Sequence, residues 1–149
     1  MIRHARETGL RYGWVGVDSL YGSTAAFLNE LEDMGERFMA DINKTTKLWT
    51  SPPLLEAPTA GKGRPRKHPR PHPDNTAHYV SVESLVAERF EAGHRVLSYR
   101  QGQKGKLTTR LRVCPVWCWE KGWTTPRGRL LVVRRDADGS RVAWTCERE

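Results

Sequence analysis

The apolar residues near the start of the chain follow a strand pattern, then a helix pattern, then a strand pattern again. A short apolar run over residues 12–18, ending in an acid, predicts a buried strand, and residues 37–42 predict a second one. Between them, Ser23 or Thr24 can cap a helix that Gly35 ends. The apolar stripe of that helix comprises Phe27, Leu31 and Met34. A strand, a helix and a strand in about 30 residues form a βαβ unit, so we expect the two strands to be parallel.

The pattern breaks between residues 43 and 76, which hold most of the nine prolines. This composition predicts a long loop or linker, with polyproline character between Pro65 and Pro73. A second helix is predicted from its cap at Ser81 to about Ala92, with Gly93 as its end. The apolar face of this helix comprises Val82, Leu85, Val86 and Phe90.

From His94 onward the chain has the composition of β-structure. Turns are expected at 101–105, 120–128 and 136–139, the last with a strong Asp-Gly hairpin signal. The four expected strands are Val96–Arg100, Leu107–Trp119, Arg129–Arg135 and Arg141–Cys146. The chain therefore divides into a βαβ part over 1–45, a Pro/Arg-rich linker loop over 46–78 and a β-rich part over 79–149. The fold class is α/β, or more broadly α+β.

Positive charge is concentrated in two blocks. The 149 residues include 25 Lys and Arg against 17 Asp and Glu, a formal net charge of +8. Residues 61–73 hold five of these cations and no acid, and residues 94–135 hold eleven cations against one acid. Such blocks favour a surface that neutralises a polyanion such as DNA, although a solvated basic face is the plainer interpretation.

Composition also excludes several classes of protein. No apolar stretch approaches the roughly 18 residues of a membrane span, so we expect no membrane partner. The first 13 residues lack the apolar core of a signal peptide. Three cysteines do not build a disulfide scaffold and fit a reducing cytosol.

The first basic block contains a Gly-Arg-Pro core, in Gly63-Arg64-Pro65, that resembles an AT-hook. An AT-hook inserts an extended backbone into the minor groove of A·T-rich DNA. General phosphate contact and an inert linker are the alternatives. The cations that we expect to contact DNA are Arg64, Arg66, Lys67, Arg100, Lys104, Lys106, Arg110 and Arg112.

Tryptophans lie among the cations of the second block. Trp117 and Trp119 share one face of a predicted strand, and Trp123 falls in a turn. Such rings can stack on unpaired bases, but in a small sheet they more often form the core. We assign Trp123 to DNA contact and favour a place in the core for Trp117 and Trp119, with base stacking as the alternative.

Asp18 is the most informative single residue. A carboxylate at the carboxyl end of a βαβ strand faces the crevice where such sheets bind ligands, and there it can hold a hard cation. The alternative is that Asp18 only caps the turn over Ser19–Gly22 or the helix that follows.

The run Val15–Gly22, followed by Phe27–Leu31 and Phe38–Ile42, resembles the segment around the second catalytic Asp of insertion-sequence DDE transposases of the DDE superfamily endonuclease type. The Gly-Arg-Pro loop and the later strands agree in order, so the resemblance extends from about Tyr12 to Thr145. It implies an RNase H-like catalytic core interrupted by a β-rich insertion. It also implies Mg²⁺ as cofactor, DNA as partner, and an oligomer acting on transposon ends.

In this family three carboxylates hold two divalent cations, and the resemblance makes Asp18 a catalytic residue and a metal ligand. The first Asp and the Glu have no counterpart in the expected contexts, and Asp41 is given no role. We therefore expect an internal piece of a transposase, inactive alone, in the cytoplasm of a bacterium and associated with the nucleoid. The alternative is a small, non-enzymatic, basic DNA-binding protein built around the AT-hook-like loop.

Overall fold

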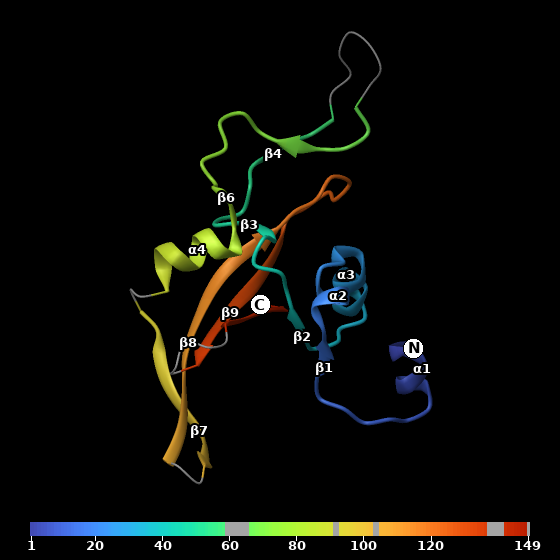
Figure 1. Cartoon of the computed structure of the whole chain (residues 1–149). Coiled ribbons are helices and arrows are strands. Elements are labelled where there is room, and N and C mark those ends of the chain that lie inside the picture. The colour runs from blue at the N-terminus through green and yellow to red at the C-terminus, as the bar shows by residue number, and fades with distance from the viewer. Residues whose placement is uncertain (59–65, 91–92, 103–104, 137–141, 149) are drawn as a thin grey trace.

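The computed structural model describes residues 1–58, 66–90, 93–102, 105–136 and 142–148, with the backbone alone described at 99–102, 105–107, 136 and 142–148 (Figure 1). Its helices are α1 (Ile2–Glu7), α2 (Ser19–Gly22), α3 (Ala25–Asp33) and α4 (Val82–Arg89). Its strands are β1 (Val15–Val17), β2 (Phe38–Asp41), β3 (Lys47–Trp49), β4 (Leu55–Glu56), β5 (Arg70–Pro71), β6 (Tyr79–Ser81), β7 (Arg95–Gly102), β8 (Gly105–Cys118), β9 (Arg127–Asp136) and β10 (Val142–Arg148). Among the described residues, no helix is long and apolar enough to cross a membrane.

One mixed sheet joins the two ends of the chain. In the described residues its order is β1-β2-β10-β9-β8-β3-β6, with β7 also paired to β8. β1 and β2 are parallel, with Val17 opposite Ala40, and the pairs that follow along this order are antiparallel. The predicted βαβ unit, the later antiparallel strands and the α+β fold class are therefore confirmed.

The βαβ unit has its own small core. Leu28 and Leu31 on α3 are buried against Phe38 and Ala40 of β2 and Val17 of β1. Phe27 and Met34 lie at the margin of this core and are only partly buried. Gly35 ends the helix with a φ of 73°, a left-handed conformation that glycine adopts without steric cost.

A second core forms where α4 packs on the antiparallel strands. Val82, Leu85, Val86 and Phe90 are buried there, as the helical pattern predicted. They pack with Ile42, Leu48, Cys114, Val116, Leu131 and Val133. Ser81 caps α4 by accepting a hydrogen bond from the Ser84 backbone N–H at 3.1 Å, which confirms the predicted start of this helix.

Both cores lie on the same face of the sheet. Cys146 of β10 stands opposite both Ala40 and Leu131 in the strand register. Residues directly opposite one another in a ladder point to the same face, so α3 and α4 cover one side. On the other side Met39 is 41% exposed and Val113 is 49% exposed. The described helices thus leave this second face open.

A buried cation ties the two halves together on the covered face. Arg129 of β9 is only 1% exposed, and its Nη2 donates to Asn29 Oδ1 at 2.8 Å and to Glu32 Oε2 at 3.2 Å. Arg127 pairs with Glu32 at 3.1 Å and with Asp33 at 3.0 Å. These contacts fix α3 against the start of β9.

The structure departs from the sequence-based expectations in three places. The expected loop over 43–76 contains β3, β4 and β5, and β3 joins the main sheet by pairing Trp49 with Trp117. The expected turn over Ser19–Gly22 is the short helix α2. Trp117 and Trp119 are half-buried and belong to neither core. The division of the chain into parts at residues 45 and 78 stays a prediction. The main sheet contains strands from each of the three expected parts.

Candidate functional site

Asp18 stands at the carboxyl end of β1, directly after Val17. Val17 is in register with Ala40 of the parallel strand β2. Asp41 follows Ala40 and is the last residue of β2, so it lies at the same edge of the sheet as Asp18. Both acids are exposed. Sequence reasoning placed Asp18 at a strand end correctly. It gave Asp41 no role, although the same edge of the sheet receives both residues.

The Asp18 carboxylate also caps α2. Its Oδ1 accepts the backbone N–H of Leu20 at 3.1 Å and of Tyr21 at 3.2 Å. The Asp18 backbone is extended, with φ −73° and ψ 172°, as expected of a capping residue. Asp18 therefore does cap α2, and the cap fixes the side chain at the strand end while using one carboxylate oxygen.

Gly22 allows α2 to lie directly on the end of β2. A Cβ atom at this position would overlap the backbone carbonyl oxygen of Asp41. The Gly22 N–H donates to the Asp18 carbonyl at 2.7 Å. The absence of a side chain at Gly22 thus places the turn after Asp18 against the neighbouring strand end.

A pair of divalent cations needs several oxygen ligands. Among the described residues, no group of three or more His, Cys, Asp or Glu side chains is arranged so that it could hold a metal ion. Asp18 supplies one carboxylate that is already half engaged in capping. The described residues by themselves therefore do not fit a two-metal centre.

Residues 66–70 of the first basic block form one wall of a pocket beside the turn that follows β8. We call this the basic pocket; it is lined by Arg66, Lys67, His68, Pro69, Arg70, Trp119 and Lys121. The structure thus brings the predicted residues Arg66 and Lys67 together with two residues that sequence reasoning did not assign to DNA, Arg70 and Lys121. Arg64 and Lys104 lie outside the described residues.

The other predicted cations lie along β7 and β8, and the Gly102–Gly105 end of this β7–β8 arm lies at the opposite end of the molecule from β4 and β5 (Figure 1). Arg110 is exposed on β8. Arg112 is half-buried, with its guanidinium against Gly93 and its Nε buried without a hydrogen-bond partner among the described residues. The backbone of Arg100 and Lys106 lies nearer the tip of the arm. The predicted DNA-contacting residues therefore form two groups, not one.

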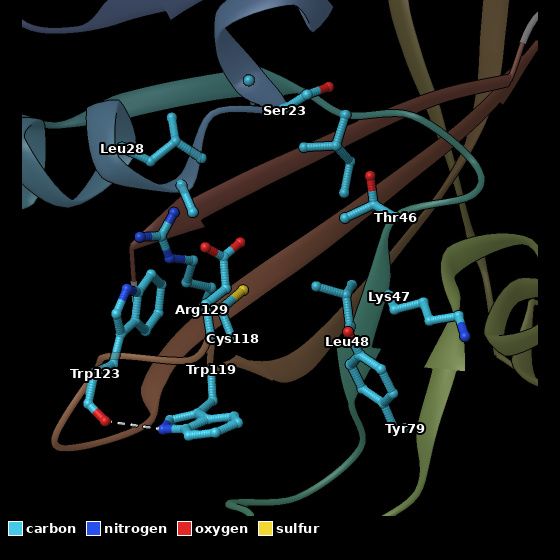
Figure 2. Close-up of a pocket in the computed structure, with 14 residues that line it drawn as sticks. Ser23, Leu28, Thr46, Lys47, Leu48, Tyr79, Cys118, Trp119, Trp123 and Arg129 are labelled. Atoms are coloured by element: carbon cyan, nitrogen blue, oxygen red, sulfur yellow. Dashed lines mark hydrogen bonds between the residues drawn. The ribbon is translucent and has the colours of Figure 1, made fainter. Parts of the chain in front are cut away.

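The aromatic residues near the turn after β8 are held by a specific contact. Figure 2 shows the Trp119 Nε1–H donating to the Trp123 carbonyl oxygen, at 3.1 Å. The Arg127 guanidinium lies 6.0 Å from the centre of the Trp123 ring. Trp119, Trp123, Arg129 and Tyr79 line a pocket next to α3 (Figure 2). Trp119 belongs to both this pocket and the basic pocket, whereas the predicted Trp123 lines only the first of them.

Glu56 is the acidic partner of the basic pocket. Its carboxylate accepts Arg70 Nε–H at 2.8 Å and Arg66 Nη2–H at 3.4 Å. These bonds hold the pKa of Glu56 below its ordinary value, with the Arg70 hydrogen bond as the largest cause. The carboxylate is therefore ionised near neutral pH and neutralises part of the loop's charge.

Comparison with known proteins gives one finding. A family model described as DDE superfamily endonuclease matches residues 1–106. This range includes the βαβ unit, Asp18 and the basic loop. No curated protein and no solved structure matches the chain.

Proposed function

Because the chain belongs to the DDE superfamily endonucleases, we propose that it takes part in metal-dependent cleavage and strand transfer of DNA at the ends of an insertion sequence. The membership gives the chain a transposase-like nuclease function. The observation that carries the finer proposal is Asp18, exposed at the carboxyl end of β1 beside a parallel strand. Mg²⁺ is the proposed metal ion, and Asp18 is proposed as one of its ligands.

Asp18 needs partner carboxylates that the described residues do not bring to it. These residues alone do not carry out two-metal chemistry. We therefore propose that the chain functions as part of a larger transposase assembly on transposon ends, and that the isolated chain does not cleave DNA.

DNA binding in this proposal uses both groups of cations. Charge and exposure support contacts by Arg66, Lys67 and Arg110. The sequence supports the same role for Arg64, Arg100, Lys104, Lys106 and Arg112, with Trp123 as an aromatic contact. A DNA-bound protein of this kind works at the bacterial nucleoid.

The test compares two acids at neighbouring strand ends. A marked copy of the gene with its flanking DNA is assayed for excision in cells, with Asp18→Asn as the variant and Asp41→Asn as the matched control. Asn caps helices about as well as Asp, so Asp18→Asn keeps the cap on α2 and removes the charged ligand. We expect Asp18→Asn to reduce excision to background and Asp41→Asn to retain it.

Excision that survives Asp18→Asn would remove Asp18 from the metal site. A purified chain that binds DNA equally well with either variant, from a locus that shows no excision, would favour the non-enzymatic DNA-binding alternative. A circular dichroism spectrum of each variant checks that its fold is unchanged.

A further inference from the structure

The contact between Glu56 and two arginines has a geometry that a phosphate group could replace. Glu56 and Arg70 are register partners on β4 and β5. The two Glu56 oxygens take one N–H each from Arg70, at 2.8 Å, and Arg66, at 3.4 Å. Both arginines also line the basic pocket. The carboxylate therefore binds the guanidinium groups of two arginines that line the pocket.

We propose that the basic pocket is a binding site for a backbone phosphate of DNA and that Glu56 is its built-in competitor. The proposal rests on the proposed function, since it takes DNA as the partner. It adds a defined phosphate site and two cations that the sequence analysis did not assign to DNA, Arg70 and Lys121. It also assigns Glu56 as a residue that lowers the affinity for DNA.

The chemistry of the pocket suits a phosphodiester. Carboxylates and phosphates accept the same charge-assisted hydrogen bonds from guanidinium groups. Lys121, from the turn after β8, and Lys67 add point charges to the lining. Trp119 provides an apolar wall for the sugar, and its hydrogen bond to the Trp123 carbonyl holds it in place.

The exposure of the Glu56 pairs allows the exchange. The Glu56 side chain is 26% exposed, and its partners Arg66 and Arg70 are 38% and 54% exposed. Ion pairs at this level of exposure are weak because water and salt screen them. A polyanion of high charge density can therefore displace Glu56, and the carboxylate reduces affinity without closing the site.

The decisive variant is Glu56→Gln, which keeps the side-chain shape and removes the competing charge. Binding of a short fluorescein-labelled duplex of arbitrary sequence is measured by anisotropy over a range of KCl concentrations. We expect the affinity to rise about 3- to 10-fold at low salt, as two weak surface pairs are released. We also expect the log–log salt slope to steepen by about one unit, as for one more phosphate contact.

A matched control separates the local effect from net charge. Glu83 is another exposed acid, paired with Lys44 at 3.2 Å and placed at the start of α4. Glu83→Gln makes the same change in net charge without touching the basic pocket, so its affinity should stay close to that of the wild type. The double variant Glu56→Gln/Arg70→Ala should lose the gain, because the released guanidinium is gone.

The opposite wall is tested in the same assay. Lys121→Gln should weaken binding, while Lys44→Gln, which removes an exposed lysine outside the pocket lining, should not. Glu56→Gln binding that equals or falls below the wild-type value would overturn the proposal and make Glu56 an organiser of the loop. A wild-type chain without salt-dependent DNA binding would instead contradict the proposed function itself. Thermal melting of each variant confirms that it is folded.

Discussion

At the scale of the residue, Glu36 is a buried carboxylate that accepts three side-chain hydrogen bonds. It is 6% exposed and accepts Arg6 Nε–H at 2.9 Å, Arg6 Nη2–H at 2.8 Å and the Tyr12 hydroxyl at 3.1 Å. The Arg6 guanidinium also lies 3.8 Å from the centre of the Tyr12 ring. Arg6 lies on α1 and Tyr12 lies in the segment before β1. Their contacts with Glu36, just before β2, hold both of these segments against the start of β2.

The cluster predicts an acid-sensitive contribution to stability. The hydrogen bonds from Arg6 are the largest cause that holds the pKa of Glu36 below its ordinary value of 4.5. Folding thus favours the ionised form, so the contribution is fully present above pH about 4.5 and is lost as the pH falls through the lowered pKa. We expect Glu36→Gln to lower the urea midpoint at neutral pH and to flatten the fall in stability below pH about 4.5.

The control for this prediction is Glu30→Gln. Glu30 pairs with Arg3 at 3.7 Å, and both side chains are well exposed, at 63% and 70%. Such a pair contributes little, so the urea midpoint should hardly move. If the two substitutions lowered the urea midpoint equally, the burial of Glu36 would not explain its contribution to stability.

The chemistry of single residues was partly predictable from sequence. The apolar run ending in Asp18 located that acid at a strand end, and the same short-range pattern offered its capping role. The partnership of Glu56 with Arg70 could not be predicted, because it depends on β4 and β5 pairing across a loop. The position of Trp119 beside Lys67 could not be predicted either, since the linker and the turn after β8 meet only in the folded chain.

At the scale of the element, the packing of α2 against the end of β2 depends on one glycine, Gly22. A Cβ at Gly22 would overlap the Asp41 carbonyl, so Gly22→Ala must push α2 off the strand end. We expect it to destabilise the fold by about 1–3 kcal/mol, as other overpacked sites do. Gly16→Ala is the control, because nothing lies within 4 Å of a Cβ there. Chemical denaturation of both variants gives the comparison, and equal stability would contradict this account of α2.

Element prediction succeeded where one sequence pattern fixed one element. The stripe at Leu31 and the cap at Ser81 each mark a helix that the structure contains. β3 was missed because three residues in a proline-rich segment show no period, and the strand exists through its pairing with β6 and β8. The join between β10 and β2 was equally hidden, because it pairs residues about a hundred positions apart, such as Ala40 and Cys146.

At the scale of the whole molecule, the basic pocket and the Gly102–Gly105 end of the β7–β8 arm lie at opposite ends of a long β-ribbon (Figure 1). The 14 residues of β8 run from Gly105, next to Lys106, past Arg110 and Arg112 to Cys118, just before the turn that carries Lys121. At about 3.3 Å per residue this strand spans roughly 43 Å. That distance corresponds to about 13 base pairs of duplex at 3.4 Å per pair. One duplex of sufficient length could therefore contact both groups.

This geometry predicts a length threshold for binding. Affinity for duplex DNA should rise with probe length up to about 13 base pairs and then level off. The affinities are first corrected for the larger number of binding positions that a longer probe offers. Lys106→Gln on the arm should weaken binding of probes longer than this threshold and leave shorter probes, held at the basic pocket, nearly unaffected. Lys121→Gln should weaken both. Because each lost phosphate contact lowers the salt slope by about 0.9, the slope for long probes should exceed that for short ones. If Lys106→Gln weakened the binding of short and long probes equally, contact with both groups would not require a duplex that spans the length of β8. That result would contradict the predicted threshold.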